Sequence, residues 1–402
     1  MTSTHLDTII SELRKTEFPA TKHGIFLAAS GGSPLCRSAV KASVAVLEEM
    51  GRVGDTQFPK YIFGMNEARM HIAEYLGARA KEIAFMPNSS SSAAVMTRLL
   101  KRAGVTHVFF PTGEFPTSTH ALRNAGFTML PVGKPMLDDT PEEWLEEIST
   151  AVHGLPHAVN AALITSHVNF LSGTRVDLPA VSAFCLEQKL KLVVNATQSF
   201  GALPIDIDGI DILFGTGLKW AAAGFGTGFL YIDQSIVDEV GLPCHTGWLS
   251  IETPGPMDNT QYVPVPCAKS LDMGGGAPPF QNILALGGAL EVISTIGEGD
   301  IRRGVVRIER RVLALAGYLH DKLSALRLDF VGPMSDSRAS GTLSVIHPDA
   351  QRIHDALSQQ HIYTSLRNHP VTREASVIRF GVNYFVTREE IDTAVATLTT
   401  ML

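Results

Sequence analysis

Seven short apolar segments, most of them separated by helical patterns, constrain the fold of this chain more than any other feature. They cover residues 82–87, 106–111, 128–133, 161–168, 190–196, 211–216 and 228–232. The segments are almost continuously apolar, as expected for strands covered by helices on both faces of a sheet. Helical patterns at 92–104, 141–152 and 178–189 lie between them. This order predicts a mostly parallel α/β sheet whose loops meet at one edge, where such folds bind ligands.

The pattern changes near residue 280. Two strongly helical stretches, 280–297 and 301–326, precede strand-like segments at 341–348, 361–367 and 376–384, and a closing helix begins at Thr387. The turn-rich sequences PVPC and GGGAPP occupy the crossing between the two regions. We therefore predict an N-terminal helical segment at 1–24 that packs with the small domain, a large domain at 25–275, and a smaller α+β domain at 276–402.

The bulk properties exclude several functional classes. A length of 402 residues suits two or three domains. The net charge of −7, without a dense Lys/Arg run, argues against a nucleic-acid partner. The N-terminus lacks the basic start and apolar core of a secretory signal, and no apolar run approaches the length of a membrane span. We expect no membrane partner and a cytoplasmic location.

The cysteines and histidines indicate neither a disulfide framework nor a metal site. The four cysteines (Cys36, Cys185, Cys244 and Cys267) have no CxxC spacing, which is typical of a reducing compartment. There is no HExxH sequence. His153 and His157 are four residues apart, but Gly154 and Pro156 deny them a shared helix face.

Lys219 is the strongest candidate for a reactive residue. It lies between the apolar segment 211–216 and the glycine-rich sequence GFGTGF, which leads into the next strand. A lysine held at a strand end and removed from water has a lowered pKa, which suits an amine that forms a Schiff base. The segment VVNATQSFG ends a nearby strand with polar side chains. Together these segments predict a pyridoxal 5′-phosphate (PLP) site in the large domain.

Other residues fit the same site, and each also has a structural interpretation. MPNSSSSAA ends a strand and starts a helix, whose N-terminus favours an anion such as phosphate, although serines also cap helices. Phe115 follows a strand and a turn, where its ring could lie over a cofactor or pack in the core. Arg379 lies in an apolar strand and needs either a carboxylate ligand or an internal salt bridge.

In their order along the chain, these motifs resemble the class V aminotransferases, fold-type-I PLP enzymes that include cysteine desulfurases, kynureninases, isopenicillin N epimerase-like proteins and C–S lyases. IFLAASGGSPLCRSAV is similar to the family's N-terminal substrate loop, and TGLKW to its Schiff-base motif. The resemblance implies that Lys219 holds PLP and acts as general acid and base. It also implies that Ser90, Ser91 and Thr216 bind the cofactor phosphate and that Phe115 stacks on the pyridine ring.

The resemblance extends to the remaining site residues and to the assembly. SHVNFLSG is similar to the strand and turn beside the phenolic oxygen of PLP, which makes Asn169 a candidate contact. NATQ places Asn195 and Gln198 where the family usually carries Asp-x-x-Gln or Asp-x-x-His. RFGVNYFVTREEI resembles the strand whose arginine, here Arg379, grips the substrate carboxylate. GGGAPP resembles a loop supplied by the partner subunit, so the resemblance implies a homodimer with active sites at the interface and a small amino acid substrate.

Asn195 departs from the family pattern. An aspartate normally keeps the pyridine nitrogen protonated, whereas a neutral asparagine cannot stabilise that charge. We infer a weaker electron sink, which disfavours transamination more than epimerisation or β-elimination. A natural asparagine and one introduced to replace aspartate are both consistent with the sequence.

Three activities thus stay open, namely those of an aminotransferase, a β-eliminating lyase and an epimerase. A PLP-binding sensor or assembly subunit with reduced catalysis is the alternative that Asn195 keeps open. A desulfurase that uses its own C-terminal thiol is disfavoured because no cysteine follows Cys267. A nucleotide-binding protein is disfavoured because no GxxxxGK[ST] loop is present and GFGTGF lies between strands.

Overall fold

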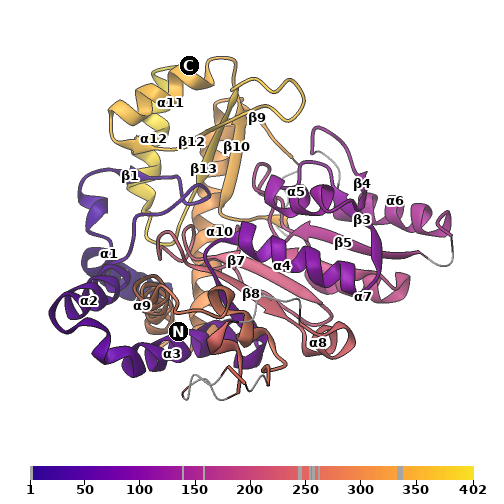
Figure 1. Ribbon diagram of the computed structural model, residues 1–402. Coiled ribbons are helices and arrows are strands. Elements are labelled where there is room, and N and C mark those ends of the chain that lie inside the picture. Colours follow the sequence, from indigo (N-terminus) through magenta and orange to yellow (C-terminus); the bar gives the residue numbers. More distant parts are fainter. Residues whose placement is uncertain are drawn as a thin grey trace.

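A seven-stranded sheet forms the centre of the computed structural model (Figure 1). The structure describes residues 3–137, 140–156, 159–242, 247–252, 255, 259–260, 263–332 and 338–402. The strand order is β2-β8-β7-β6-β5-β3-β4, with β8 antiparallel to both neighbours and the other pairs parallel. The strands are β2 (Ile83–Met86), β3 (Val105–Pro111), β4 (Thr128–Val132), β5 (Asn160–Ser166), β6 (Lys191–Asn195), β7 (Ile212–Thr216) and β8 (Gly228–Ile232). The mostly parallel sheet predicted from the apolar segments is confirmed.

The apolar strands are explained by a core on each face of this sheet. In β5, Ala161 and Leu163 point into one apolar cluster, whereas Ala162 and Ile164 point into the other. Helices α4 (Ser89–Arg102), α5 (Pro116–Asn124) and α8 (Gln234–Val240) contribute to the second cluster, and α6 (Pro141–His153) and α7 (Leu178–Gln188) to the first. Both faces of the sheet are therefore covered by apolar side chains, so the strand sequences do not alternate between polar and apolar residues.

The C-terminal part of the described chain contains a four-stranded sheet with the order β12-β13-β10-β9. Its strands are β9 (Asp329–Phe330), β10 (Thr342–Ile346), β12 (Ser365–Arg367) and β13 (Val377–Gly381), and its neighbouring helices are α10 (Ile301–Ala325), α11 (Ala350–Gln359) and α12 (Arg388–Thr399). The predicted strand at 361–367 consists of two short strands, β11 (Ile362–Tyr363) and β12. Strand β1 (Ile25–Phe26) pairs in parallel with β11, so the start of the predicted large domain joins the C-terminal part.

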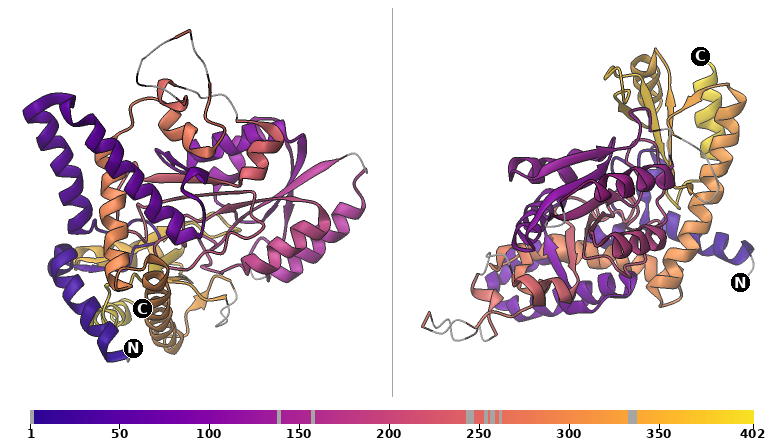
Figure 2. Two further views of the ribbon diagram at one scale, coloured as in Figure 1. Left: turned by 90° about the horizontal axis from the view of Figure 1, so that it is seen from below. Right: turned by 90° about the vertical axis from the view of Figure 1, so that its right-hand side faces the viewer.

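Two helices that the sequence patterns did not single out, α2 (Arg37–Val53) and α3 (Phe58–Leu76), pack on α9 (Phe280–Ile296), which lies within the helical stretch predicted at 280–297. Helices α2 and α3 form a hairpin at one edge of the molecule (Figure 2, left). Helix α9 is buried along most of its length. The short 3₁₀ helices are η1 (Pro19–Lys22), η2 (Gly54–Gln57), η3 (Ala80–Glu82), η4 (Trp248–Ser250) and η5 (Ala268–Gly274).

The first helix, α1 (Ser3–Glu17), is fastened to the C-terminal part of the chain. The Arg14 guanidinium donates to the carbonyl of Phe385 at 2.6 Å and forms a bidentate pair with Glu390. The Phe18 ring stacks on the Phe385 ring at a centroid distance of 4.2 Å. These contacts join α1 to residues that follow β13, and the domain bounds given above stay predictions.

A buried ion pair joins three segments below the central sheet. The Arg69 guanidinium on α3 pairs with the Asp272 carboxylate on η5 and donates to the carbonyl of Ile83 at 2.6 Å. Asp272 also accepts the backbone N–H of Phe85 at 2.8 Å. Because every partner of this buried pair is a fixed backbone or charged group, the removal of either side chain would leave an uncompensated charge.

No single helix among the described residues is long and apolar enough to cross a membrane. By length and composition alone, the pair α9 and α10, bent by 75°, passes the same test together. No group of three or more His, Cys, Asp or Glu residues in the described ranges could hold a metal ion, and Cys244 lies outside those ranges.

Candidate active site

Lys219 lies in a tight loop between β7 and β8. The loop is closed by hydrogen bonds from the Gly217 N–H to the Thr227 carbonyl and from the Ala223 N–H to the Gly217 carbonyl, both at 2.9 Å. Ala222 has a φ of +57°, a left-handed conformation that a residue with a Cβ adopts at a cost. The neighbouring Trp220 is completely buried and fixes the loop against the protein. The lysine is thus held in one place while its amine is left available.

The Lys219 amine has no carboxylate partner among the residues that the structure describes. Burial, together with the positive charges of Arg379 and Arg367, lowers the pKa of Lys219 to about 7. Near neutral pH a large fraction of the amine is therefore unprotonated. This state is the one that attacks a carbonyl carbon.

The reactivity of Lys219 in the cofactor-free protein should follow this lowered pKa. Its rate of modification by trinitrobenzenesulfonate, followed by mass spectrometry of the Lys219 peptide, should rise through about pH 7 and level off above it. The reactivity of an ordinary lysine amine, whose pKa is about 10.4, continues to rise well above pH 7. The peptide that carries the exposed Lys101 is the internal control. Parallel profiles for the two lysines would contradict the assignment.

Phe115 lies beside this amine. The Lys219 Nζ is 5.6 Å from the centroid of the Phe115 ring, and the ring makes an edge contact with Phe170 at 5.3 Å. Phe115 is the N-cap residue of α5, followed by Pro116 at the first helical position. The turn directs the ring over the edge of the sheet, where it can cover one face of a planar ligand.

The N-terminus of α4 meets the N-terminus of α5 close to the end of β7. Ser90 Oγ lies 3.2 Å from Thr117 Oγ1, which joins the first turns of the two helices. Ser89 Oγ lies 3.0 Å from Thr197 Oγ1, which joins α4 to the end of β6. Convergent hydroxyls and free helix N–H groups favour an anion. Ser89 and Thr197 were not predicted, although Thr197 lies within the NATQ sequence.

We call the hydroxyls and N–H groups at the first turns of α4 and α5 the phosphate cradle. Ser91 and Thr216 lie at different places around it. The Ser91 N–H and hydroxyl both donate to the Asn88 side chain, so Ser91 completes the N-cap of α4. Thr216 ends β7 opposite Gly228, and a Cβ on Gly228 would lie 2.8 Å from the Asn88 nitrogen. Only a glycine permits this approach, which brings Thr216 beside the start of α4. The assignment of Ser90, Ser91 and Thr216 to the phosphate stays a prediction.

Asn195 and Gln198 are buried at the end of β6 with their amides already engaged. Asn195 Nδ2 donates to Ser118 Oγ at 3.1 Å, and its Oδ1 accepts the Thr197 N–H at 3.0 Å. Gln198 Nε2 donates to the Ser30 carbonyl at 2.9 Å, and its Oε1 accepts the Trp220 indole N–H at 3.0 Å. Gln198 therefore ties the N-terminal loop to the residue that follows Lys219.

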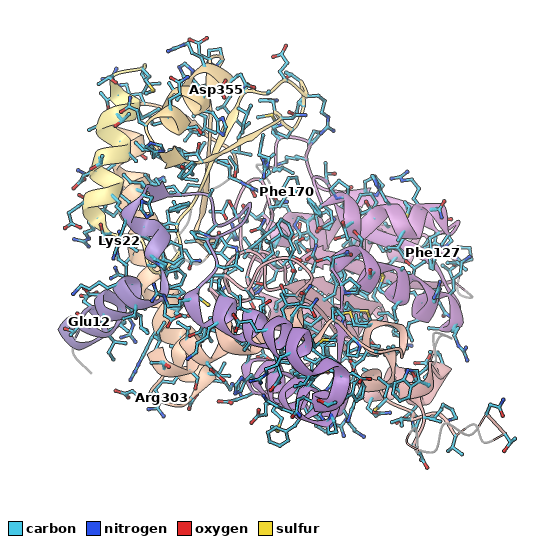
Figure 3. All side chains as sticks on the ribbon, turned by 60° about the vertical axis from the view of Figure 1, so that its left-hand side comes forward. Glu12, Lys22, Phe127, Phe170, Arg303 and Asp355 are labelled. Atoms are coloured by element: carbon cyan, nitrogen blue, oxygen red, sulfur yellow. The ribbon has the colours of Figure 1, made fainter. Side chains whose placement is uncertain are left out.

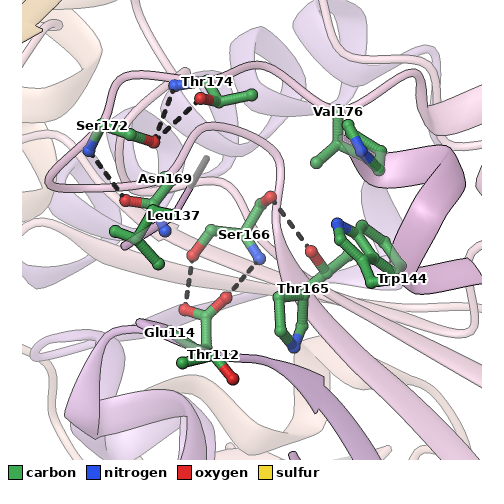
Figure 4. A pocket seen from close by; sticks show the side chains of 12 residues that line it. Thr112, Glu114, Leu137, Trp144, Thr165, Ser166, Asn169, Ser172, Thr174 and Val176 are labelled. Carbon is green, nitrogen blue, oxygen red and sulfur yellow. Dashed lines mark hydrogen bonds between the residues drawn. The ribbon is translucent and has the colours of Figure 1, made fainter. Parts of the chain in front are cut away.

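A carboxylate that the sequence patterns did not reveal lies behind Asn195. The Glu114 carboxylate accepts a hydrogen bond from Ser118 Oγ at 3.0 Å. It also accepts hydrogen bonds from the N–H and the hydroxyl of Ser166 at 2.7 and 2.5 Å (Figure 4). Burial raises the pKa of Glu114, against the hydrogen bonds that lower it. A chain of hydrogen bonds thus runs from Glu114 through Ser118 to the amide of Asn195.

Asn169 lies in the pocket drawn in Figure 4, which is also lined by Glu114, Ser166 and Trp144. Its Oδ1 accepts the N–H groups of Leu171 and Ser172 at 2.9 and 3.0 Å, and its Nδ2 donates to the Gly113 carbonyl at 3.3 Å. Lys219 does not line this pocket. The structure shows Asn169 as the organiser of its own turn, and its contact with a cofactor stays a prediction.

Arg379 is almost completely buried and largely unsatisfied. Its Nη1 donates to the carbonyl of Phe170 at 2.5 Å, whereas its Nε and Nη2 have no hydrogen-bond partner. Burial, together with the charge of Arg367, lowers the pKa of Arg379 to about 9. Figure 3 shows Phe170 where the C-terminal part meets the central sheet. A buried guanidinium with free donors is a binding group for a carboxylate.

These residues fit the cofactor that the resemblance implies. An amine of low pKa without a counter-ion stands ready for the aldehyde, and the Phe115 ring stands beside it for the pyridine ring. The first turns of α4 and α5 supply donors for a phosphate. On the side of the C-terminal sheet, Nε and Nη2 of Arg379 have no hydrogen-bond partner and can bind an anion.

Comparison with known proteins places the chain among related sequences and folds. The family described as "Aminotransferase class-V" matches residues 25–393. The kynureninase of Deinococcus radiodurans is 23% identical over 82% of this chain and 76% of its own length. The uncharacterized aminotransferase YcbU of Bacillus subtilis is 24% identical over 94% of each protein. The apo structure of the cysteine desulfurase from Thermococcus onnurineus NA1 has the same fold, with a TM-score of 0.81, 18% identity and coverage of 97% of each chain.

Proposed function

The chain belongs to the class-V aminotransferase family, and from that premise we propose that it is a PLP-dependent lyase that eliminates a β-substituent from an α-amino acid. The family makes it a PLP-dependent enzyme of amino acid chemistry, and the fold is that of fold-type-I enzymes. Lys219 carries the proposal because its amine has no carboxylate partner among the described residues and its lowered pKa suits both attachment and proton transfer. The alternative of a non-catalytic binder is not favoured by these findings.

Bound PLP supplies an electron sink for the α-carbon of an attached amino acid. Arg379 would hold the α-carboxylate through its free Nε and Nη2 donors and so fix the orientation of the bonds at Cα. Phe115 would exclude water from one face of the ring. Lys219, once its amine is free, would take the Cα proton and pass a proton to the departing β-substituent. The enamine that is released tautomerises and is hydrolysed to a 2-keto acid and ammonia.

The charged groups around Lys219 favour chemistry with one base. The groups whose charges reach its amine are Arg379 and Arg367, and neither guanidinium can take a proton from carbon. His167, which follows β5, is completely buried, and burial lowers its pKa to about 3, so it is a poor base. Epimerisation with inversion commonly uses proton delivery on both faces of Cα. Elimination needs one base.

Asn195 supports elimination over transamination. Its neutral amide is bonded to Ser118 and to the Thr197 N–H, and it brings no negative charge to the end of β6. A weaker electron sink penalises the proton transfer that transamination requires at the cofactor. Loss of a β-leaving group proceeds without that transfer.

A product assay with the PLP-loaded protein tests this function. Cystine, whose β-substituent carries a second carboxylate, should yield pyruvate and ammonia in equal amounts without any keto acid acceptor. An activity that appears only when a keto acid acceptor is supplied would assign the chain to transamination. Inversion of a chiral amino acid in deuterated water, without release of ammonia, would assign it to epimerisation.

Replacement Asn195→Asp should raise the rate of the transamination half-reaction by about tenfold, the effect of about 1.4 kcal/mol on a barrier. The new carboxylate can still accept the Thr197 N–H, and the Ser118 hydroxyl can turn from Glu114 to donate to it. Stopped-flow spectra with an amino acid, compared with those of the wild type, measure the rate. Asn195→Ser is the matched control without charge. An unchanged half-reaction in the aspartate variant would refute our account of Asn195.

We further propose that the protein is a homodimer with active sites at the interface. Apolar side chains are exposed along the outer faces of α2 and α3 and in the loop after Lys219: Val40, Val44, Leu47, Phe63, Met70 and Phe225. The start of α2 adjoins that loop because the Cys36 N–H donates to the Ala222 carbonyl at 3.1 Å. Exposed apolar side chains on neighbouring helices are suited to contact with a second copy of the chain.

A cytoplasmic location is also a proposal. Cys36, Cys185 and Cys267 are free and buried, which suits a reducing compartment. Sedimentation velocity at micromolar concentration tests the dimer, and fractionation of the native cells tests the location. A monomer, or recovery outside the cytoplasm, would contradict the respective proposal.

A further inference from the structure

Arg367 is a second guanidinium for which the proposed reaction provides no role. It lies in β12, and its Nη1 donates to the carbonyl of the adjacent Leu366 at 2.7 Å. Among the described residues no carboxylate forms an ion pair with it, and burial lowers the pKa of its side chain. A partly buried cation without a counter-ion is costly and points to a ligand that is negatively charged.

The register of the C-terminal sheet places Arg367 on the same face as Arg379. Ser365 of β12 lies directly opposite Arg379 of β13, and directly paired residues of antiparallel strands share a face. Arg367 is two residues beyond Ser365, so its side chain points to that face as well. The two arginines are diagonal neighbours, whose Cβ atoms lie about 7–8 Å apart in such a pair.

The same face looks toward the site of the lysine. A Cβ on Gly31 would lie 3.0 Å from Ser365 Oγ and 3.7 Å from Arg367 Nη2, so the N-terminal loop passes directly beside this guanidinium. The preceding Ser30 accepts the hydrogen bond from Gln198, and its hydroxyl is buried without a partner. Arg367 therefore lies next to the loop that Gln198 ties to the cofactor end of β6.

An amino acid with one carboxylate would compensate only one of the two guanidinium charges on this face. The phosphate cradle lies at α4 and α5, on the central sheet, and the α-carboxylate supplies one negative charge for Arg379. One guanidinium is left uncompensated. We propose that Arg367 binds a second anionic group on the substrate, so that the substrates are α-amino acids with an additional acidic group beyond the α-carbon. This inference rests on the proposed function only in that the site receives an amino acid.

Binding of amine-free acids to the PLP-loaded protein tests this substrate class without any turnover. Isothermal titration calorimetry compares glutarate with valerate and succinate with butyrate, pairs that share their chain length but differ by one carboxylate. The wild type should bind each dicarboxylate about tenfold more tightly or better than its partner, as expected for hydrogen bonds to a charged group. Arg367→Gln should abolish this preference and leave the monocarboxylate affinity unchanged. Arg367→Lys should keep part of it.

Arg373→Gln is the matched control, because Arg373 is exposed in the turn between β12 and β13 and loses the same charge. The visible band of the bound cofactor verifies that each variant keeps its site. A wild type without preference would overturn the inference. So would an Arg367→Gln variant that weakens both kinds of acid equally, because both arginines would then grip one carboxylate. A dicarboxylate preference without any lyase product would refute the proposed function and leave the substrate class standing.

Discussion

Replacement Lys219→Ala should lower turnover of the PLP-loaded protein by about 10²–10⁴-fold, the contribution of a positioned general acid and base. The loss arises because the charged groups that act on the Lys219 amine are Arg379 and Arg367, and a guanidinium cannot take a proton from carbon. The cofactor should also lose its covalent attachment. After borohydride reduction and denaturation, the wild type should keep the cofactor on the Lys219 peptide, and the variant should release it.

Two further measurements make this result specific. Lys101→Ala removes an exposed lysine on α4 and should leave turnover and attachment unchanged. Added methylamine should restore part of the activity of Lys219→Ala, because it can replace the missing amine. A variant that retains wild-type turnover, or a reduced cofactor found on another lysine, would contradict the assignment of Lys219.

Replacement Arg379→Ala should raise KM for an amino acid substrate by about 10- to 150-fold, the range of about 1.5–3 kcal/mol for hydrogen bonds to a charged group. Its Nε and Nη2 have no hydrogen-bond partner and are free to donate to the carboxylate of a substrate. Loss of orientation at Cα should also lower kcat. Arg379→Lys should recover only part of the affinity, because an ammonium lacks the planar fork.

A thermal melt distinguishes this role from a structural one. The Arg379 side chain has one hydrogen-bond partner, the carbonyl of Phe170, and carries a buried charge without a counter-ion. Its removal should therefore change the midpoint of the cofactor-free protein by no more than a few degrees. A large fall in the midpoint together with unchanged KM would show that Arg379 supports the fold instead of the substrate.

The apolar segments made the central sheet predictable, but α2 and α3 left no comparable signal. Ala39 and Val46 of α2 are buried, whereas Val40, Val44 and Leu47 on its other side are exposed. The helix is amphipathic, but its apolar side is wider than the strip that is buried, and the sequence pattern does not show which part stays exposed. Which side of α2 is buried against α9 and which side is exposed depends on how the helices pack, and a single sequence does not show that packing.

The candidate site residues could be proposed from the sequence where they follow a strand, and could not be proposed where packing brings them to the site. Lys219, Asn195 and Phe115 each follow or end an apolar segment. Glu114 gains its role from the hydrogen bonds to Ser118 and Ser166, which lie on different elements. Arg367 was predicted only as part of a strand, because its relation to Arg379 depends on the register of β12 against β13.

In the proposed site, cofactor binding and substrate binding are divided between the two sheets. Residues suited to hold the cofactor come from the central sheet and its helices, whereas both arginines come from β12 and β13 of the C-terminal sheet. Substitutions in β12 can thus change which side chain is accepted without disturbing the lysine loop or the phosphate cradle. Descendants of this architecture can acquire new substrates while the inherited chemistry stays intact, and a laboratory library confined to 362–379 samples that freedom directly.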